Sequence, residues 1–109
     1  LFNKGKLKRD YLYAEDAVKS IYLSLKKIKN IKFEILNIGG GNPTDAITIF
    51  KKIKKICKTQ SNAIFSNKKN KNIIKNIFMN VNKAKKIINY RSNSLDNNLR
   101  TMFNDYKKK

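Results

Sequence analysis

The feature that most constrains the fold is a β-like run, residues 33–38, that ends directly in Gly39-Gly40-Gly41. The run is rich in aromatic and β-branched residues, which favour strands, and the glycines together with Pro43 indicate a turn. A helix is expected from about Thr44 or Asp45, with its inner side formed by Ile47, Phe50, Ile53, Ile56 and Cys57. This order of strand, glycine turn and helix predicts an α/β fold.

The glycine run also allows a phosphate-binding interpretation, because glycines let backbone N–H groups approach an anion at a helix N-terminus. Its spacing fits neither G-x-x-x-x-G-K-[ST] nor G-x-G-x-x-G, and Lys51 lies too far along the chain to be the lysine of such a loop. We therefore interpret Gly39-Gly40-Gly41 as a tight turn between a strand and a helix.

A second passage from strand to helix is predicted near the start of the chain. A glycine turn at Gly5 precedes residues 10–14, which are short and aromatic and are expected to form a brief strand. Asp16 then stands where a helix N-cap belongs. The helix after it is predicted to bury one face, formed by Ala17, Val18, Ile21, Tyr22, Leu25 and Ile28.

The second half of the chain is more polar. Residues 58–72 are predicted to be a loop with a short strand at residues 63–65, and residues 77–81 are expected to be extended. A short helix should run through residues 84–88, and Ser94 should cap a final helix whose apolar face carries Leu95, Leu99, Met102, Phe103 and Tyr106. Residues 1–109 are thus expected to form one α/β unit, an α+β arrangement of short strands and about four helices.

The net charge of +19, from 26 Lys+Arg against 7 Asp+Glu, suggests nucleic acid or an anionic membrane when it is taken alone. The excess is nearly all lysine, however, whereas bidentate recognition of phosphate or guanine favours arginine. Lysine, asparagine and isoleucine are over-used together, as in residues 67–76, and all three have A/T-rich codons. We therefore expect no specific nucleic-acid partner, and a small basic nucleic-acid-binding protein is the alternative hypothesis.

Several other classes of site are disfavoured by composition. Cys57 is the only cysteine and the chain has no histidine, so an internal disulfide is excluded and no metal site is expected. No apolar run is long enough to span a bilayer, and we expect a cytoplasmic protein without a membrane partner. Leu1 is not an initiator methionine, so a preceding segment is expected.

Arg9 is the first candidate binding residue, because it is isolated among lysines just ahead of the expected strand. Its guanidinium could bind a diphosphate bidentately, or it could form a plain salt bridge with Asp10 or Glu15, and spacing alone favours neither. Tyr22 and Lys26 have the Tyr-x-x-x-Lys spacing of a general-base tyrosine with a helping lysine. Tyr22 falls on the apolar face of its helix, so we interpret it as core packing.

Taken together, these residues resemble the C-terminal part of an NAD-dependent epimerase/dehydratase, in the extended short-chain dehydrogenase family that acts on nucleotide sugars. Residues 2–6 are similar to the glycine turn before the family's Arg-Asp-aromatic-aliphatic-Tyr/His-x-x-Asp segment, which residues 9–16 match. Residues 37–44 resemble its Asn-Ile-Gly-x-Gly-x-x-Thr/Ser turn. Residues 80–90 and the helix after Ser94 resemble its closing Asp-x-Ser-Lys-Ala segment, Gly-Tyr/Trp pair and final helix.

The resemblance implies roles for particular residues. Arg9 would bind the diphosphate of a nucleotide-sugar substrate, Asn37 would lie in the same pocket, and Asp16 would be structural, as a helix cap. NAD and the catalytic Tyr-x-x-x-Lys would belong to an N-terminal Rossmann half that is absent from residues 1–109, so no catalytic or cofactor-binding residue is assigned. The family often dimerises, so a homodimer of the longer protein is one further expectation.

The sequence departs from the family pattern at several positions. Residues 70–73 lack its Arg-Pro-Gly-Asp-like segment, Asn80 replaces the usual aspartate, and Asn89 replaces the glycine before Tyr90. A degenerate, non-catalytic relative is therefore a third hypothesis. The leading prediction is the nucleotide-sugar-binding fragment of an NAD-dependent sugar epimerase (an isomerase) or dehydratase (a lyase), inactive alone.

Overall fold

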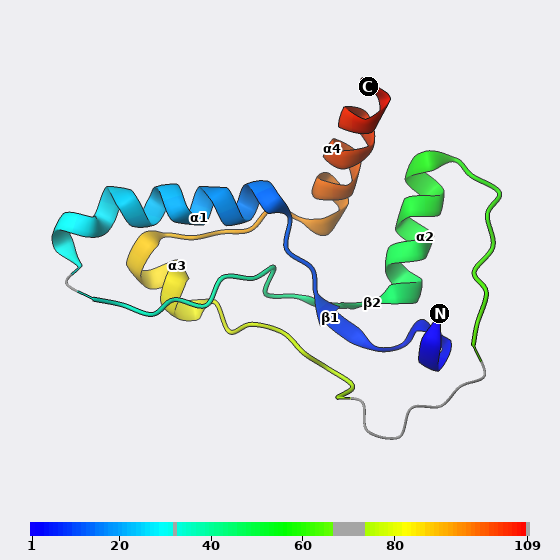
Figure 1. Ribbon diagram of the computed structural model, residues 1–109, viewed down its shortest axis with the longest axis horizontal. Helices are drawn as coiled ribbons and strands as arrows, with labels where there is room; N and C mark the ends of the chain where they lie inside the picture. Colours follow the sequence, from blue (N-terminus) through cyan, green and yellow to red (C-terminus); the bar gives the residue numbers. More distant parts are fainter. Residues whose placement is uncertain (32, 67–73, 109) are drawn as a thin grey trace.

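Four helices and a two-stranded sheet make up the described part of the computed structural model, which covers residues 1–31, 33–66 and 74–108 (Figure 1). The helices are α1 (Ala14–Lys27), α2 (Ala46–Cys57), α3 (Asn82–Ile88) and α4 (Leu95–Lys107). The strands are β1 (Lys8–Asp10) and β2 (Pro43–Asp45), and short 3-10 turns lie at Phe2–Gly5 and Ile28–Asn30. The α/β class, with short strands and four helices, is confirmed.

The strands lie at other residues than predicted. β1 and β2 are antiparallel, with Arg9 opposite Thr44, and the N–H of Lys8 also donates to the carbonyl of Lys75 at 2.9 Å. Of the expected strand at residues 10–14 only Asp10 is in a strand, opposite Pro43 at the end of β1, and the expected strand at residues 33–38 has no strand partner in the described chain. The strand expected at residues 63–65 is also absent from the described structure.

The core is small and is centred on α3. The buried apolar side chains of the described residues are Val81, Ala84, Ile88 and Tyr90. Tyr90 is completely buried and its hydroxyl donates to the carbonyl of Gly39 at 3.0 Å. Burial, reinforced by the nearby carboxylates of Asp16 and Asp10, raises the pKa of Tyr90 above its usual value, so the hydroxyl keeps the proton that it donates.

Asp16 is buried, but it is not the N-cap that the sequence suggested. The N-cap of α1 is Tyr13, and Asp16 lies within the first turn with 1% of its surface exposed. Its carboxylate accepts hydrogen bonds from the backbone N–H and side-chain amide of Asn93 and from the side-chain amide of Asn98, at 3.0–3.1 Å. Asp16 therefore joins α1 to the start of α4, a role that local helix signals do not encode.

The apolar face of α1 is also misassigned by the sequence. The residues expected to be buried are mostly exposed, and the buried positions of the helix are Asp16 and Ser20. The other side of α1, which includes Leu23, packs on the core near α3. Figure 1 shows α3 and residues 33–38 below α1, while its upper side carries no other element of the described chain.

The ends of the other helices follow the sequence closely. Asp45 caps α2 by accepting from the N–H of Thr48 at 2.7 Å, and Ser94 caps α4 by accepting from the N–H of Asn97 at 3.2 Å. Asn89 ends α3 in the left-handed conformation (φ 54°), which explains why asparagine can replace the family's glycine there. Residues 70–73, the departure noted above, lie outside the described residues.

The molecule is thin for its length. Its principal extents are 51 × 41 × 18 Å and its radius of gyration is 16.9 Å, whereas a folded domain of this length has a radius of about 13 Å. α2 and α4 stand side by side at one end, joined by an ion pair between Lys52 and Asp96 at 2.5 Å, and α1 extends away from them (Figure 1). The fold is thus an open layer around a small core.

Replacing Asp16 with alanine should destabilise the protein strongly, because the donors of Asn93 and Asn98 then lose a charged acceptor. We expect the free energy of unfolding to fall by about 3 kcal/mol, from the usual cost of deleting a charged hydrogen-bond partner. Urea unfolding followed by circular dichroism measures this change. Asp105→Ala, which removes an exposed ion pair with Lys108, is the matched control and should change stability little. Equal effects of the two substitutions would contradict the role given to Asp16.

The cap of α2 should make stability pH-dependent. The hydrogen bonds from Thr48 lower the pKa of Asp45, so the cap stabilises the fold above the unfolded-state pKa of about 3.9 and is lost as the pH falls through the folded-state value. Asp45→Ala should cost about 1 kcal/mol near neutral pH and progressively less in acid. Ser94→Ala, which removes the uncharged cap of α4, should cost a similar amount at every pH. Parallel pH profiles for the two variants would refute this account.

Candidate functional site

Arg9 lies on β1 with its guanidinium against backbone rather than against a carboxylate. Its Nη1 donates to the carbonyls of Lys8 (2.7 Å), Ile74 (3.2 Å) and Lys75 (3.5 Å). In the described residues it forms no ion pair, so the salt bridge to Asp10 or Glu15 that the sequence allowed does not occur there. The guanidinium is thus held in place while its charge is not neutralised by an acid.

A cavity of about 180 Å³ adjoins Arg9. Its wall is apolar apart from Arg9 and Asp10, and it comes from β1, the glycine turn and the segment before α3; the lining residues are Arg9, Asp10, Leu12, Ile38, Gly39, Ile77, Phe78 and Met79. Complete ligand pockets usually measure about 300–1,000 Å³. The cavity can therefore hold only part of a ligand the size of a nucleotide sugar.

Asp10 fixes the geometry of this cavity. Its Oδ2 accepts from the N–H of Met79 at 3.0 Å and from the N–H of Gly41 at 3.2 Å, so one carboxylate joins β1, the glycine turn and the segment before α3. A Cβ added at Gly39 would overlap the Asp10 carboxylate, and one at Gly40 would lie 2.6 Å from the carbonyl oxygen of Tyr11. The glycines are required because the backbone approaches this carboxylate so closely.

The glycine turn is consequently not a phosphate cradle. The N–H of Gly41 already donates to Asp10, and the carbonyls of Gly39 and Gly40 accept from Tyr90 and from the hydroxyl of Ser92. An anion bound here would be repelled by the negative charge of Asp10. The glycines do form a turn, although it leads from an unpaired segment into β2 and not from a strand directly into a helix, and the residues present do not fit the pyrophosphate of NAD.

Asn37 is exposed and precedes the glycine turn, and it does not line the cavity beside Arg9. The structure thus holds Arg9 at the cavity and leaves Asn37 outside it. The sequence did not single out Asp10 as the residue that organises this cavity. The sequence analysis gives Asp10 only as a possible salt-bridge partner of Arg9, as the start of an expected strand and as part of the family's Arg-Asp segment.

The Tyr22 and Lys26 pair does not form a proton-transfer site. Lys26 Nζ lies over the face of the Tyr22 ring, 4.5 Å from its centre, and Tyr22 is 55% exposed. The prediction that Tyr22 is core packing is therefore wrong, because no described residue covers this side of α1. Among the described residues no group of three or more His, Cys, Asp or Glu could hold a metal ion. None of the helices in the described part is long and apolar enough to cross a membrane.

Comparison with solved structures decides the type of fold. Superposition on UDP-glucose 4-epimerase from Thermotoga maritima, solved with UDP-glucose, gives a TM-score of 0.84 and 26% identity over 99% of this chain. The chain matches a C-terminal part of the nucleotide-sugar epimerases and dehydratases. It spans only about a third, 34%, of the Thermotoga chain.

Other solved structures agree with this match. UDP-glucuronic acid 4-epimerase from Bacillus cereus, in complex with UDP-glucuronic acid and NAD, gives a TM-score of 0.80 at 26% identity, with coverage of 99% of this chain and 34% of that one. dTDP-glucose 4,6-dehydratase from Bacillus anthracis, in complex with NAD, shares the fold with a TM-score of 0.79 at 21% identity and the same coverage. No family model and no curated protein matches the sequence.

Proposed function

We propose that this chain is the substrate-binding part of an NAD-dependent nucleotide-sugar epimerase or dehydratase, with Arg9 binding the diphosphate. The observation that carries the proposal is the match of nearly the whole chain, at 26% identity, to an epimerase solved with UDP-glucose. The local geometry supports it, since the Arg9 guanidinium stands beside an open cavity without a carboxylate partner in the described residues. Arginine suits this role because its planar fork matches phosphate oxygens.

The proposed role is binding and orientation rather than chemistry. A guanidinium that anchors the diphosphate fixes the position of the attached sugar, so that binding energy far from the reacting carbon orients the ring. Asn37, on the exposed side of residues 33–38, is proposed to contact the same substrate from outside the cavity. The apolar wall from Ile38 and Phe78 would exclude water from one side of the anchored group.

NAD is proposed to bind elsewhere in the complete enzyme. The only glycine run in the sequence, Gly39-Gly40-Gly41, lies against the Asp10 carboxylate, which accepts a hydrogen bond from the N–H of Gly41. Lys26 lies over the ring of Tyr22 instead of approaching its hydroxyl. This chain is therefore proposed to be inactive alone. We further propose that the complete enzyme is cytoplasmic and forms a homodimer. The free thiol of Cys57 suits a reducing compartment.

The experiment is a titration of the isotope-labelled 109-residue chain with UDP-glucose, followed by NMR. Resonances around β1 and residues 77–79 should shift with UDP-glucose and not with glucose, because the diphosphate supplies the charge. Arg9→Ala should weaken binding about tenfold or more, as expected for a charged hydrogen bond.

Arg100→Ala is the matched control, since Arg100 is an exposed arginine on α4, remote in sequence from the cavity. It lowers the net charge equally and should leave the affinity almost unchanged. Equal weakening by both substitutions would show that UDP-glucose responds only to overall charge, and the proposal would then fail.

A further inference from the structure

The charge of a diphosphate sets a requirement that one arginine does not meet. Each of the two phosphoryl groups in a nucleotide sugar carries a negative charge at neutral pH, whereas Arg9 brings one positive charge. A single exposed ion pair contributes little to binding, and firm binding of phosphate comes from bidentate contacts or from several cations together. A second cation beside Arg9 is therefore expected in a site for a diphosphate.

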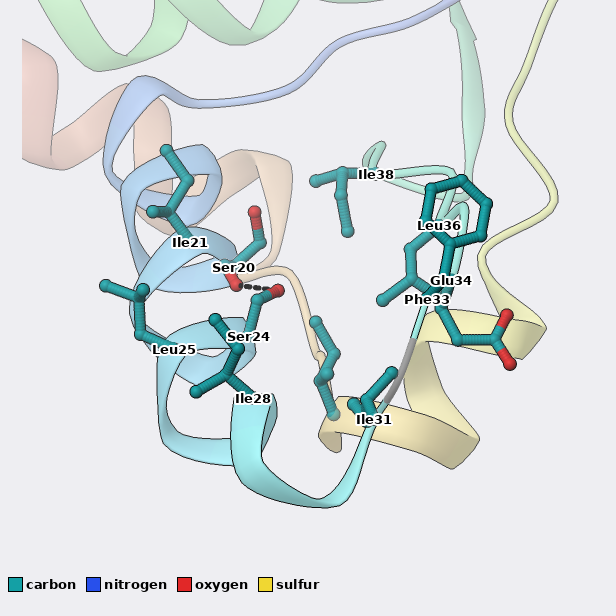
Figure 2. Close-up of a pocket in the computed structure, with 11 residues that line it drawn as sticks. Ser20, Ile21, Ser24, Leu25, Ile28, Ile31, Phe33, Glu34, Leu36 and Ile38 are labelled. Atoms are coloured by element: carbon teal, nitrogen blue, oxygen red, sulfur yellow. Dashed lines mark hydrogen bonds between the residues drawn. The ribbon is translucent and has the colours of Figure 1, made fainter.

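The groove between α1 and residues 33–38 does not contain such a pair of cations (Figure 2). It measures about 480 Å³, more than the cavity beside Arg9, and its lining is apolar except for Ser20, Ser24 and Glu34. Figure 2 shows the Glu34 carboxylate turned away from α1, and this carboxylate pairs with Lys83 of α3 at 2.5 Å. The one charged residue in the lining is thus an acid, so an anionic ligand is not expected in this groove.

Lys75 lies directly beside the guanidinium of Arg9. The Nη1 of Arg9 donates to the carbonyl of Lys75 at 3.5 Å and to that of Ile74 at 3.2 Å. Two covalent bonds separate this carbonyl oxygen from the Cα of Lys75, so the Cα lies within about 6 Å of the guanidinium. Because a lysine ammonium stands on a flexible four-carbon stem, it can reach the ligand that the guanidinium binds.

The backbone at Lys75 is fixed against β1, although the Lys75 side chain is exposed. The N–H of Lys8 donates to the carbonyl of Lys75 at 2.9 Å, and the N–H of Ile77 donates to the carbonyl of Lys8 at 3.2 Å. These bonds form a parallel bridge between Lys8 and Asn76. Arg9 and Lys75 are therefore held near each other before any ligand arrives, which lowers the cost of binding.

No acid of the described chain neutralises Lys75. The ion pairs within residues 1–31, 33–66 and 74–108 lie elsewhere, and they are Lys52–Asp96, Lys83–Glu34 and Lys108–Asp105. The charge of Lys75 is thus available to an anionic ligand, as is the charge of Arg9.

Lys8 differs from Lys75, although it precedes Arg9 directly in β1. It lies opposite Asp45 in the sheet. The hydrogen bonds from Thr48 lower the pKa of Asp45, and the charge of Lys8 adds to this effect. Lys8 therefore already has a neighbouring carboxylate, which makes it a matched comparison for Lys75.

The surroundings of Arg9 differ in charge from one end of residues 74–79 to the other. The carbonyl of Lys75 accepts from the guanidinium, whereas the N–H of Met79, four residues later, donates to the carboxylate of Asp10 at 3.0 Å. An anion is attracted to the end with the two cations and repelled from the end with the carboxylate. The phosphoryl groups are therefore expected between Arg9 and Lys75.

We infer that Arg9 and Lys75 form a two-cation site in which each residue binds one phosphoryl group, so that this chain selects nucleoside diphosphate sugars over compounds with a single phosphoryl group. The guanidinium is a planar fork and the ammonium is a point charge on a flexible stem, so the pair can adapt to two linked phosphoryl groups. The inference rests on the proposed function. It adds a second binding residue and the basis of the selectivity.

The test measures the affinity of the 109-residue chain for UDP-glucose and for UMP by calorimetry. Lys75→Gln should weaken UDP-glucose binding about tenfold, as expected for one charged contact, and Lys75→Arg, which keeps the charge, should bind UDP-glucose nearly as well as the unmodified chain. UMP has one phosphoryl group and needs one cation, so only one of Arg9→Ala and Lys75→Gln should weaken its binding. Equal weakening of UMP by both substitutions would show that the chain responds only to overall charge, and would overturn the inference.

Lys8→Gln is the matched control, because it removes the same charge one residue from Arg9 but opposite Asp45. It should leave the affinity for UDP-glucose almost unchanged, and a loss equal to that of Lys75→Gln would also overturn the inference. Because the Lys75 side chain is exposed, Lys75→Gln should leave the unfolding temperature unchanged. A loss of affinity is then not a loss of fold.

The outcomes separate this inference from the proposed function. UDP-glucose binding that requires Arg9 but is unchanged in Lys75→Gln would uphold the proposed function and reject the two-cation site. Failure of the unmodified chain to bind UDP-glucose would reject both.

Discussion

The carboxylate of Asp10 is the interaction on which the rest of the structure depends. It accepts from Gly41 and Met79, and so joins β1, the glycine turn and the segment that leads into α3. Because the backbone of Gly39 and Gly40 approaches this carboxylate closely, the turn tolerates no side chain there. The same joint sets the wall of the cavity beside Arg9, so the architecture and the proposed binding site share one constraint.

The described chain is an open layer of helices and short segments around a small core. It is 18 Å thick along its shortest axis, its core is small, and its longest helix buries Asp16 and Ser20 while its apolar side stays exposed. The charge of +19 fits a protein from an A/T-rich genome and is not needed to explain the site, where one arginine and one lysine carry the proposed contacts. Under the proposed function, this layer would bind and orient the substrate, and another domain would hold NAD.

The sequence predicted what is encoded locally. The start of α2 next to Asp45, the cap at Ser94, the turn at the glycine run and the number of helices all depend on residues near one another in the chain. It missed what depends on distant partners. Asp16 was assigned to a cap because the groups that donate to its carboxylate, on Asn93 and Asn98, are far along the chain and cannot be found from local spacing. The exposed face of α1 was assigned to a core because periodicity shows that a face is apolar but not whether the chain covers it.

The central proposal is that this chain binds a nucleotide sugar for an enzyme that holds NAD in another domain. Native mass spectrometry of the protein purified gently from its source cells tests this most directly. The account predicts that the particle containing these 109 residues carries the mass of NAD and gains the mass of UDP-glucose, or of another nucleotide sugar, when that compound is added. A particle that carries no NAD and gains no nucleotide-sugar mass would contradict it.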